Sequence, residues 1–146
     1  MLFTLPEEKV LWLLRRGRTA DVFALLEAHP RLARHRYSHG LTLLHLSSVF
    51  AQREVVTRLA DLGGDVNARD DSGHSILHLM AYESRNGDEG FAGVVDLLID
   101  RGADVNGRLP SGETALAIAL AHGQEPTEFV AALRRNGARC SASQTR

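Results

Sequence analysis

Two segments of the chain, thirty-nine residues apart, carry nearly the same sequence. Residues 62–68 read Leu-Gly-Gly-Asp-Val-Asn-Ala, and residues 101–107 read Arg-Gly-Ala-Asp-Val-Asn-Gly. A second matched pair lies upstream: residues 40–46 and 73–79 both run from a glycine to Leu-His-Leu, thirty-three residues apart. A weaker third copy occupies residues 112–118. Self-similarity at a period near thirty-three residues predicts a stack of similar supersecondary units.

Each unit is predicted to hold a turn, a short inner helix and an outer helix. In the first full unit Thr42 fits a helix N-cap, because its hydroxyl can accept a hydrogen bond from a free amide of the first turn. The apolar residues that follow Thr42 suit a helix packed on both sides. The outer helix is predicted from Gln52 to Leu62, and Gly63 supplies the left-handed residue that ends it. The matching residues of the later units are Ser75, Thr114, Gly102 and Gly137.

These segments resemble the ankyrin-repeat family, whose inner helix usually opens with Thr-Pro-Leu-His. The openings at Thr42, Ser75 and Thr114 all lack the proline, and the third also lacks the histidine. Proline at the first helical position fixes φ where no amide donor is needed. Its loss is expected to weaken each unit slightly without changing the fold. The resemblance implies an all-α solenoid of stacked helix-turn-helix units with β-turn fingers.

The resemblance covers about residues 6–139 and divides the chain into cap units and repeats. Thr19 or Asp21 is expected to cap the second helix of the N-terminal unit, and Pro30 to stop it. In the third full unit, Pro126 is predicted to start the outer helix. The expected divisions are a single domain at 1–139, with an N-terminal cap unit at 6–36, a first repeat at 37–69, a second repeat at 70–108 with an exposed insertion near 84–90, a C-terminal cap repeat at 109–139, and a flexible tail at 140–146.

Composition restricts the class of protein. A chain of 146 residues with 44% hydrophobic side chains can bury one core. The apolar runs are too short to span a membrane, and the N-terminus lacks the pattern of a signal peptide. Cys140 is the one cysteine, so no internal disulfide forms. We therefore expect a cytoplasmic, monomeric protein.

The charge is small but unevenly distributed. The formal net charge of −1 gives no general attraction to nucleic acid or anionic lipid, and neither is expected as a partner. Residues 1–40 hold seven basic and four acidic side chains, a net charge of +3, so residues 41–146 carry −4.

Histidine is the one residue type that invites a chemical function. His45 and His78 occupy the histidine position of the family, which implies that each ring bonds the neighbouring turn and links adjacent units. His35 and His39 are four apart but fall in a turn, where that spacing does not align side chains. We expect no metal site, cofactor or catalytic residue. A small histidine-dependent hydrolase is the alternative from another class.

A segment beginning at Asp65 starts like a calcium-binding loop, but the pattern then fails. Arg69 occupies a ligand position, and Asp70 stands where the sharp turn requires glycine. The Asp and Asn residues of this segment are more simply turn formers.

The resemblance implies a module that binds another protein through its concave face and turn tips. The effect is then exerted by binding itself, for example as an inhibitor or immunity-type protein that masks a toxin or enzyme. A structural subunit that associates through the ends of its stack is a further alternative. We hypothesise that the partner presents an acidic segment beside an apolar residue. The expected contact residues are Arg36, His39, Leu41, Phe50, Arg69, Asp71, His74, Tyr82, Arg108, Glu113 and His122.

Overall fold

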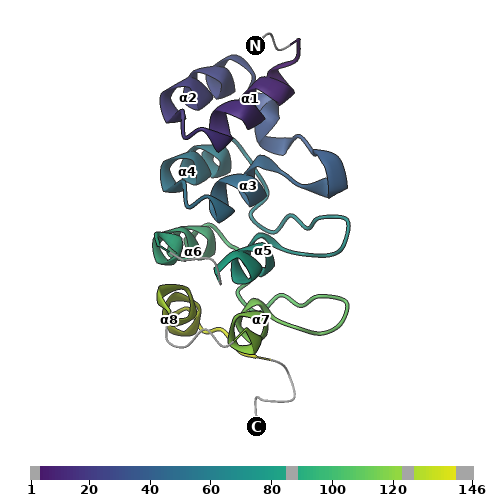
Figure 1. The fold of residues 1–146 in the computed structure, drawn as a ribbon, viewed down its shortest axis with the longest axis vertical. Helices are drawn as coiled ribbons and strands as arrows, with labels where there is room; N and C mark the ends of the chain where they lie inside the picture. Colours follow the sequence, from purple (N-terminus) through teal and green to yellow (C-terminus); the bar gives the residue numbers. More distant parts are fainter. Residues whose placement is uncertain (1–3, 85–88, 123–126, 141–146) are drawn as a thin grey trace.

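The computed structural model describes residues 4–84, 89–122 and 127–140, and within these it contains α-helices and short 3-10 helices but no strand. The α-helices follow one another as four pairs along the long axis of the molecule (Figure 1). This arrangement confirms the predicted all-α stack. The pairs are α1 (Pro6–Arg15) with α2 (Thr19–Ala28), α3 (Leu43–Val49) with α4 (Arg53–Asp61), α5 (Ile76–Glu83) with α6 (Phe91–Asp100), and α7 (Ala115–Ala121) with α8 (Glu128–Arg135).

Inner and outer helices form two layers. α3 packs on α5 and α5 on α7, while α2, α4, α6 and α8 follow one another in the second layer. Between the pairs, three loops project on the side of the inner helices (Figure 1). We call them fingers 1, 2 and 3, at residues 36–41, 69–74 and 108–113. Finger 1 contains the short helix η2 (Ser38–Gly40), and η1 (Pro30–Arg34) precedes it.

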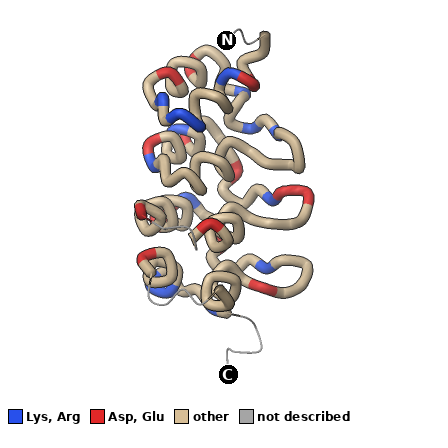
Figure 2. Tube along the Cα trace, viewed as in Figure 1, with Lys and Arg blue, Asp and Glu red and all other residues tan. Residues whose placement is uncertain are grey.

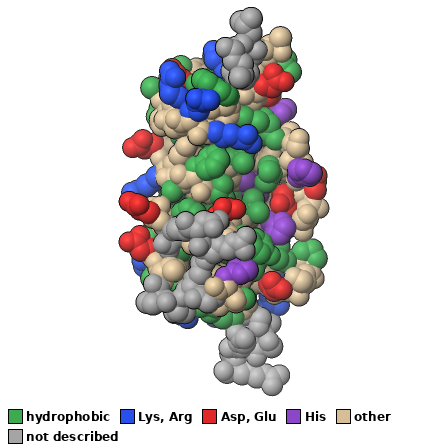
Figure 3. All heavy atoms as spheres, viewed as in Figure 1, with side chains coloured by type: hydrophobic (Ala, Val, Ile, Leu, Met, Phe, Trp, Pro, Cys, Tyr) green, Lys and Arg blue, Asp and Glu red, His purple; other side chains and the backbone are tan. Residues whose placement is uncertain are grey.

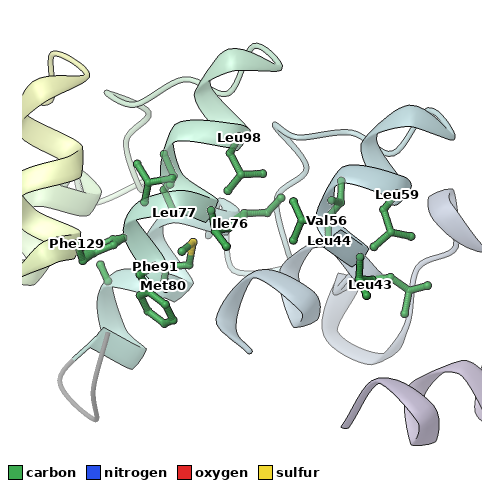
Figure 4. Close-up of a cluster of buried hydrophobic side chains, with 14 of the residues drawn as sticks. Leu43, Leu44, Val56, Leu59, Ile76, Leu77, Met80, Phe91, Leu98 and Phe129 are labelled. Atoms are coloured by element: carbon green, nitrogen blue, oxygen red, sulfur yellow. The ribbon is translucent and has the colours of Figure 1, made fainter. Parts of the chain in front are cut away.

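One continuous core runs between the two layers. Leu44, Val56 and Leu59 are fully buried between α3 and α4, and Met80 and Leu98 are fully buried between α5 and α6 (Figure 4). The outer helices of the last two pairs meet through Phe91 and Phe129, whose rings make an edge-to-face contact with centroids 5.8 Å apart. Because each pair buries its apolar face only against its neighbours, the pairs depend on one another for stability.

Polar residues define where the inner helices begin. Thr42, Ser75 and Thr114 are the N-cap residues of α3, α5 and α7, and each side chain accepts a hydrogen bond from a backbone amide of the first turn. Thr127 does the same for α8. A side-chain cap at this position is worth about 1 kcal/mol. The absent prolines are therefore compensated in part by caps.

The N-terminal pair differs from the prediction in its capping. Arg18 is the N-cap residue of α2, and no side chain caps that helix. Asp21 instead forms an ion pair with Arg18 at 2.6 Å. The prediction that Thr19 or Asp21 caps α2 was therefore wrong, because Thr19 already lies inside the helix and Asp21 is engaged by the cap residue itself.

The remaining boundaries are set by glycine. Gly63, Gly102 and Gly137 follow the outer helices with φ of 91°, 99° and 88°, a left-handed conformation that favours glycine. Pro126 and residues 85–88 of the predicted insertion lie outside the described residues. Among the residues that the structure describes, no helix combines the length and the apolar character needed to cross a bilayer.

Candidate partner-binding surface

The three fingers are closed by the same pair of backbone hydrogen bonds. In finger 1 the amide of Tyr37 donates to the carbonyl of Leu41 at 2.7 Å, and the amide of Gly40 donates back to Tyr37 at 3.1 Å. Fingers 2 and 3 repeat this arrangement at residues 70–74 and 109–113. A further bond links neighbouring fingers, since the amide of Asp71 donates to the carbonyl of His39 at 2.9 Å.

Arginine side chains connect each finger to the next. Arg36 donates from one guanidinium nitrogen to the carbonyl of Gly40 at 3.0 Å and to the carbonyl of Arg69 at 2.8 Å. Arg69 repeats the pattern one unit later, donating to Gly73 at 2.8 Å and to Arg108 at 2.7 Å. We call Arg36, Arg69 and Arg108 the arginine column. Arg108 is its last member and makes no such bond within the described residues. Arg36 and Arg69 are exposed, but one guanidinium nitrogen of each is already used to hold neighbouring fingers together.

His45 and His78 link the units from inside. The Nδ1 of His78 accepts from the cap amide of Ser75 at 3.2 Å, so its proton lies on Nε2, which donates to the carbonyl of Glu113 at 3.0 Å. His45 makes the same contacts with Thr42 at 3.2 Å and, across to finger 2, with the carbonyl of His74 at 3.4 Å. Burial lowers the pKa of both rings. Both nitrogens of each ring are therefore engaged, which leaves neither ring free to act as a base.

The last unit replaces histidine with a different link. Ala117 stands at the histidine position, and the Thr114 hydroxyl lies 2.6 Å from the carbonyl oxygen of Arg139 and 2.7 Å from that of Cys140. A hydroxyl carries one proton, so it can donate to one of these oxygens at a time. The end of the described chain is thereby held against the last inner helix.

Asn67 and Asn106 link units in a way that sequence reasoning missed. Asn67 donates from Nδ2 to the carbonyl of Gly102 at 2.9 Å, and its Oδ1 accepts from the amide of Asp104 at 2.9 Å. Asn106 makes the equivalent bonds to Gly137 and Arg139 at 3.1 and 2.7 Å. The signal was present in the two matching Asp-Val-Asn segments, but we assigned those residues only to local turns.

Three of the predicted contact residues form a row on the inner side of the stack. The ring of His74 in finger 2 meets Tyr82 at the end of α5, with centroids 5.6 Å apart, and Tyr82 meets His122 after α7 at 5.9 Å. His74 is oriented by Asp70, whose carboxylate oxygen lies 3.1 Å from Nδ1. Burial acts to raise the pKa of Asp70, but hydrogen bonds from the amide and ring of His74 outweigh it and lower that pKa.

The remaining predicted contact residues are arranged around this row. Phe50 is 43% exposed at the end of α3, one of the most exposed large apolar side chains that the structure describes. His39, Asp71 and Glu113 are exposed on the fingers, whereas Leu41 is half-buried. Figure 2 shows a basic residue on every finger and acidic residues on fingers 2 and 3 only. The surface is therefore of mixed charge, with aromatic and imidazole rings at its centre.

Metal binding finds no support in the described part of the chain. No group of three or more His, Cys, Asp or Glu side chains there is placed to hold a metal ion. His35, one of the two turn histidines, instead packs edge-to-face against Tyr37, with centroids 4.6 Å apart.

Comparison with known proteins agrees with the geometry. The family model for ankyrin repeats, in three copies, matches residues 44–144. The search of curated proteins found no match to this chain. Members of the matched family generally mediate protein–protein interactions and are typically non-catalytic. The match spans more than half of the chain and includes most of α3, the helices α4 to α8, and fingers 2 and 3. The chain therefore belongs to the ankyrin-repeat family.

Proposed function

We propose that the chain binds a partner protein through the inner side of the stack, at the fingers and the C-terminal ends of the inner helices. The observation that carries the proposal is the row His74, Tyr82 and His122, which crosses from the second unit to the third. Rings of this kind supply a large contact area at low conformational cost. No catalytic step is assigned, and the effect of the protein follows from occupying its partner.

The fingers present this surface in a fixed shape. Hydrogen bonds from Arg36, from Arg69 and from the amide of Asp71 connect consecutive fingers, so each finger is restrained by its neighbour. A surface ordered before binding loses less conformational entropy on association. The arginine column therefore supports binding indirectly as well as by any direct contact.

The chemistry of the surface suggests the chemistry of the partner. The guanidinium of Arg108 makes no hydrogen bond or ion pair within the described residues, while Phe50 and Tyr82 offer apolar area deeper in the same face. A partner segment with a carboxylate near finger 3 and an apolar side chain near Tyr82 fits this arrangement. Masking of an enzyme or toxin is one form that such binding could take.

Affinity capture from the native cell, followed by mass spectrometry, tests the proposal. The parent protein and the Tyr82→Ala variant are used as baits at matched concentration. Tyr82→Ala removes both ring contacts of the row, and we expect it to lower recovery of the partner by about tenfold or more, as for a central aromatic contact. Circular dichroism checks that the variant is folded.

Leu5→Ala is the matched control, because Leu5 is also a large exposed apolar residue, at 54% exposure, but precedes α1. It is expected to retain the partner. Equal recovery with Tyr82→Ala and with the parent, from folded proteins, would place the binding face elsewhere.

A further inference from the structure

The N-terminal helix pair carries a groove on its surface. None of the residues of the row His74, Tyr82 and His122 lines this groove. Two adjoining hollows, of about 410 and 560 Å³, share Trp12 as a wall. The first hollow lies between α1 and α2, and Leu25 is one of its lining residues. The second hollow lies along one side of α1, and Leu11 is one of its lining residues. Trp12, Leu11 and Leu25 are each half-buried, so apolar area is open along both hollows.

Apolar residues lie on more than one face of α1. Here the buried residues of α1, such as Val10 and Leu14, point into the stack, while Leu11 and Trp12 lie on another face of the same helix. Figure 1 shows no described element beyond this pair.

Basic side chains surround the groove. Lys9 and Arg15 are exposed and form no ion pair within the described residues. The guanidinium of Arg16 lies over the ring of Trp12, 4.7 Å from its centroid. Arg18 is neutralised by Asp21 at 2.6 Å, so Glu8 is the one acidic residue that offsets the other three. Figure 3 shows basic side chains beside apolar ones over this pair.

We propose that this groove, lined by Leu11, Trp12 and Leu25 and edged by Lys9, Arg15 and Arg16, binds an acidic amphipathic helix of a partner protein. An apolar groove accepts the apolar stripe of a helix. The three basic residues then meet carboxylates on the flanks of that helix, and this charge complementarity selects acidic over basic segments. The groove is a second docking surface, separate from the inner side of the stack.

A protein helix fits these features better than a membrane or a nucleic acid. Trp12 is half-buried, lines both hollows and has the guanidinium of Arg16 over its ring, so it is poorly placed to insert into a bilayer. Nucleic acid would require a wider basic surface, whereas Glu8 and Asp21 interrupt the edge of this groove.

Trp12 is the one tryptophan of the chain, so its fluorescence reports on the groove directly. The probe is a synthetic tryptophan-free peptide with leucine on one helical face and glutamate elsewhere, and the comparison peptide has every glutamate replaced by lysine. Titration with the acidic peptide is expected to shift the emission of Trp12 to shorter wavelength as the ring loses water. The lysine peptide is expected to give no such shift.

Charge reversal then identifies the edge of the groove. Lys9→Glu with Arg15→Glu is expected to weaken binding of the acidic peptide by about tenfold or more, since two attractive contacts become repulsive. Arg134→Glu with Arg139→Glu makes the same change in net charge at exposed residues of the last unit, away from the groove, and is expected to change the affinity by no more than about twofold. Circular dichroism confirms that both double variants are folded.

Several results would overturn the proposal. Equal binding of the two peptides, equal loss in the two double variants, or an unchanged Trp12 spectrum at saturating acidic peptide would each do so. Vesicles containing phosphatidylserine and a single-stranded oligonucleotide are titrated in parallel. A Trp12 shift with either of these and not with the acidic peptide would assign the groove to a membrane or a nucleic acid. None of these readouts depends on Tyr82, so failure here leaves the proposal for the inner side untouched.

Discussion

The Nε2 atom of His78 lies 3.0 Å from the backbone carbonyl oxygen of Glu113, across the boundary between two units. The other nitrogen of the same ring accepts from the amide that opens its own helix. One buried side chain therefore caps α5, fixes finger 3 and spans the interface between units. His45 has the same role one unit earlier, with a longer bond of 3.4 Å to finger 2.

Replacement of His78 by alanine is expected to destabilise the protein. His78→Ala leaves the cap amide of Ser75 and the carbonyl of Glu113 without their ring partner, a loss of about 1–3 kcal/mol in the free energy of unfolding. The effect of His45→Ala is expected to be smaller, because its link to the next finger is longer. Urea unfolding followed by circular dichroism measures both.

His122→Ala serves as the control for histidine loss, because His122 is exposed and lies at the end of the row, beside Tyr82. Its effect is expected to stay within about 0.5 kcal/mol, as for ordinary surface positions. If His78→Ala were no more destabilising than His122→Ala, the ring would not link the units.

Stability is expected to fall on mild acidification. Burial lowers the pKa of His45 and His78 below the ordinary value of 6.5. As the pH falls through 6.5, the unfolded chain therefore binds protons that the folded chain still excludes. The unfolded state then holds more protons, so the free energy of unfolding decreases with decreasing pH. The contribution is complete above this range and is lost below it.

Urea unfolding at a series of pH values from about 8 to about 5 measures this slope. The double variant His45→Ala with His78→Ala is expected to show a flatter dependence over the same range. The lowered pKa values of Glu7, Asp70 and Asp96 act below the ordinary values of 4.5 for Glu7 and 3.8 for the two aspartates, at or beneath the lower end of this range. The double variant keeps all three groups, so the comparison isolates the two histidines. Stability that stayed constant or rose from neutral pH to about pH 5 would contradict the assignment.

The architecture could be predicted because the sequence features that determine it recur in each unit. The N-cap residue, the apolar inner helix and the terminal glycine recur at matching positions, and each has a local physical cause. The cap unit before Thr42 was harder, because α2 begins without any side-chain cap. A cap was therefore expected at Thr19 or Asp21, where the helix had already begun.

The direction of long side chains could not be predicted from the same repeats. A recurring arginine suits a solvated surface, a contact with a partner or a bond to the next finger equally well, and only the conformation of the side chain separates them. Arg36 and Arg69 donate hydrogen bonds to the next finger, while Arg108 makes no such bond within the part of the chain that the structure describes. The groove on α1 was missed for a related reason, since the half-exposed face of Trp12 cannot be read from the sequence.

The three arginines of the arginine column are expected to differ in their contribution to stability, according to the hydrogen bonds that each makes to the next finger. Arg69→Ala removes bonds to Gly73 and Arg108 and should lower the free energy of unfolding by about 0.5–1.5 kcal/mol. Arg36→Ala should behave in the same way. Arg108→Ala, which removes no such bond, should remain within about 0.5 kcal/mol of the parent and serves as the control. Thermal or urea unfolding distinguishes them, and three equal effects would show that the bonds to the next finger contribute nothing.

One substitution is expected to stabilise the protein. Ala51, in the turn between α3 and α4, has a φ of 55°, a left-handed conformation that is unfavourable for a residue with a Cβ atom. Its amide donates to the carbonyl of Ser48 at 3.0 Å and that of Gln52 donates to Ser47 at 2.9 Å, so this conformation is needed to end α3. The outer helix α4 of the same unit is instead followed by a glycine in this conformation, Gly63. Ala51→Gly is therefore expected to raise the free energy of unfolding by up to about 1 kcal/mol.

The same substitution inside a helix should have the opposite sign. Ala131 is exposed in the middle of α8, where glycine costs about 1 kcal/mol relative to alanine. Urea unfolding of Ala51→Gly and Ala131→Gly side by side therefore separates relief of backbone strain from the general flexibility of glycine. Ala51 also packs against the core and lies close to Gly90: a Cβ atom built on Gly90 would be 3.2 Å from the Ala51 methyl group. Removing this methyl group therefore also removes some apolar contact. If Ala51→Gly destabilised the protein as much as Ala131→Gly does, that contact would outweigh the strain, and the left-handed turn would not be a weak point of the first unit.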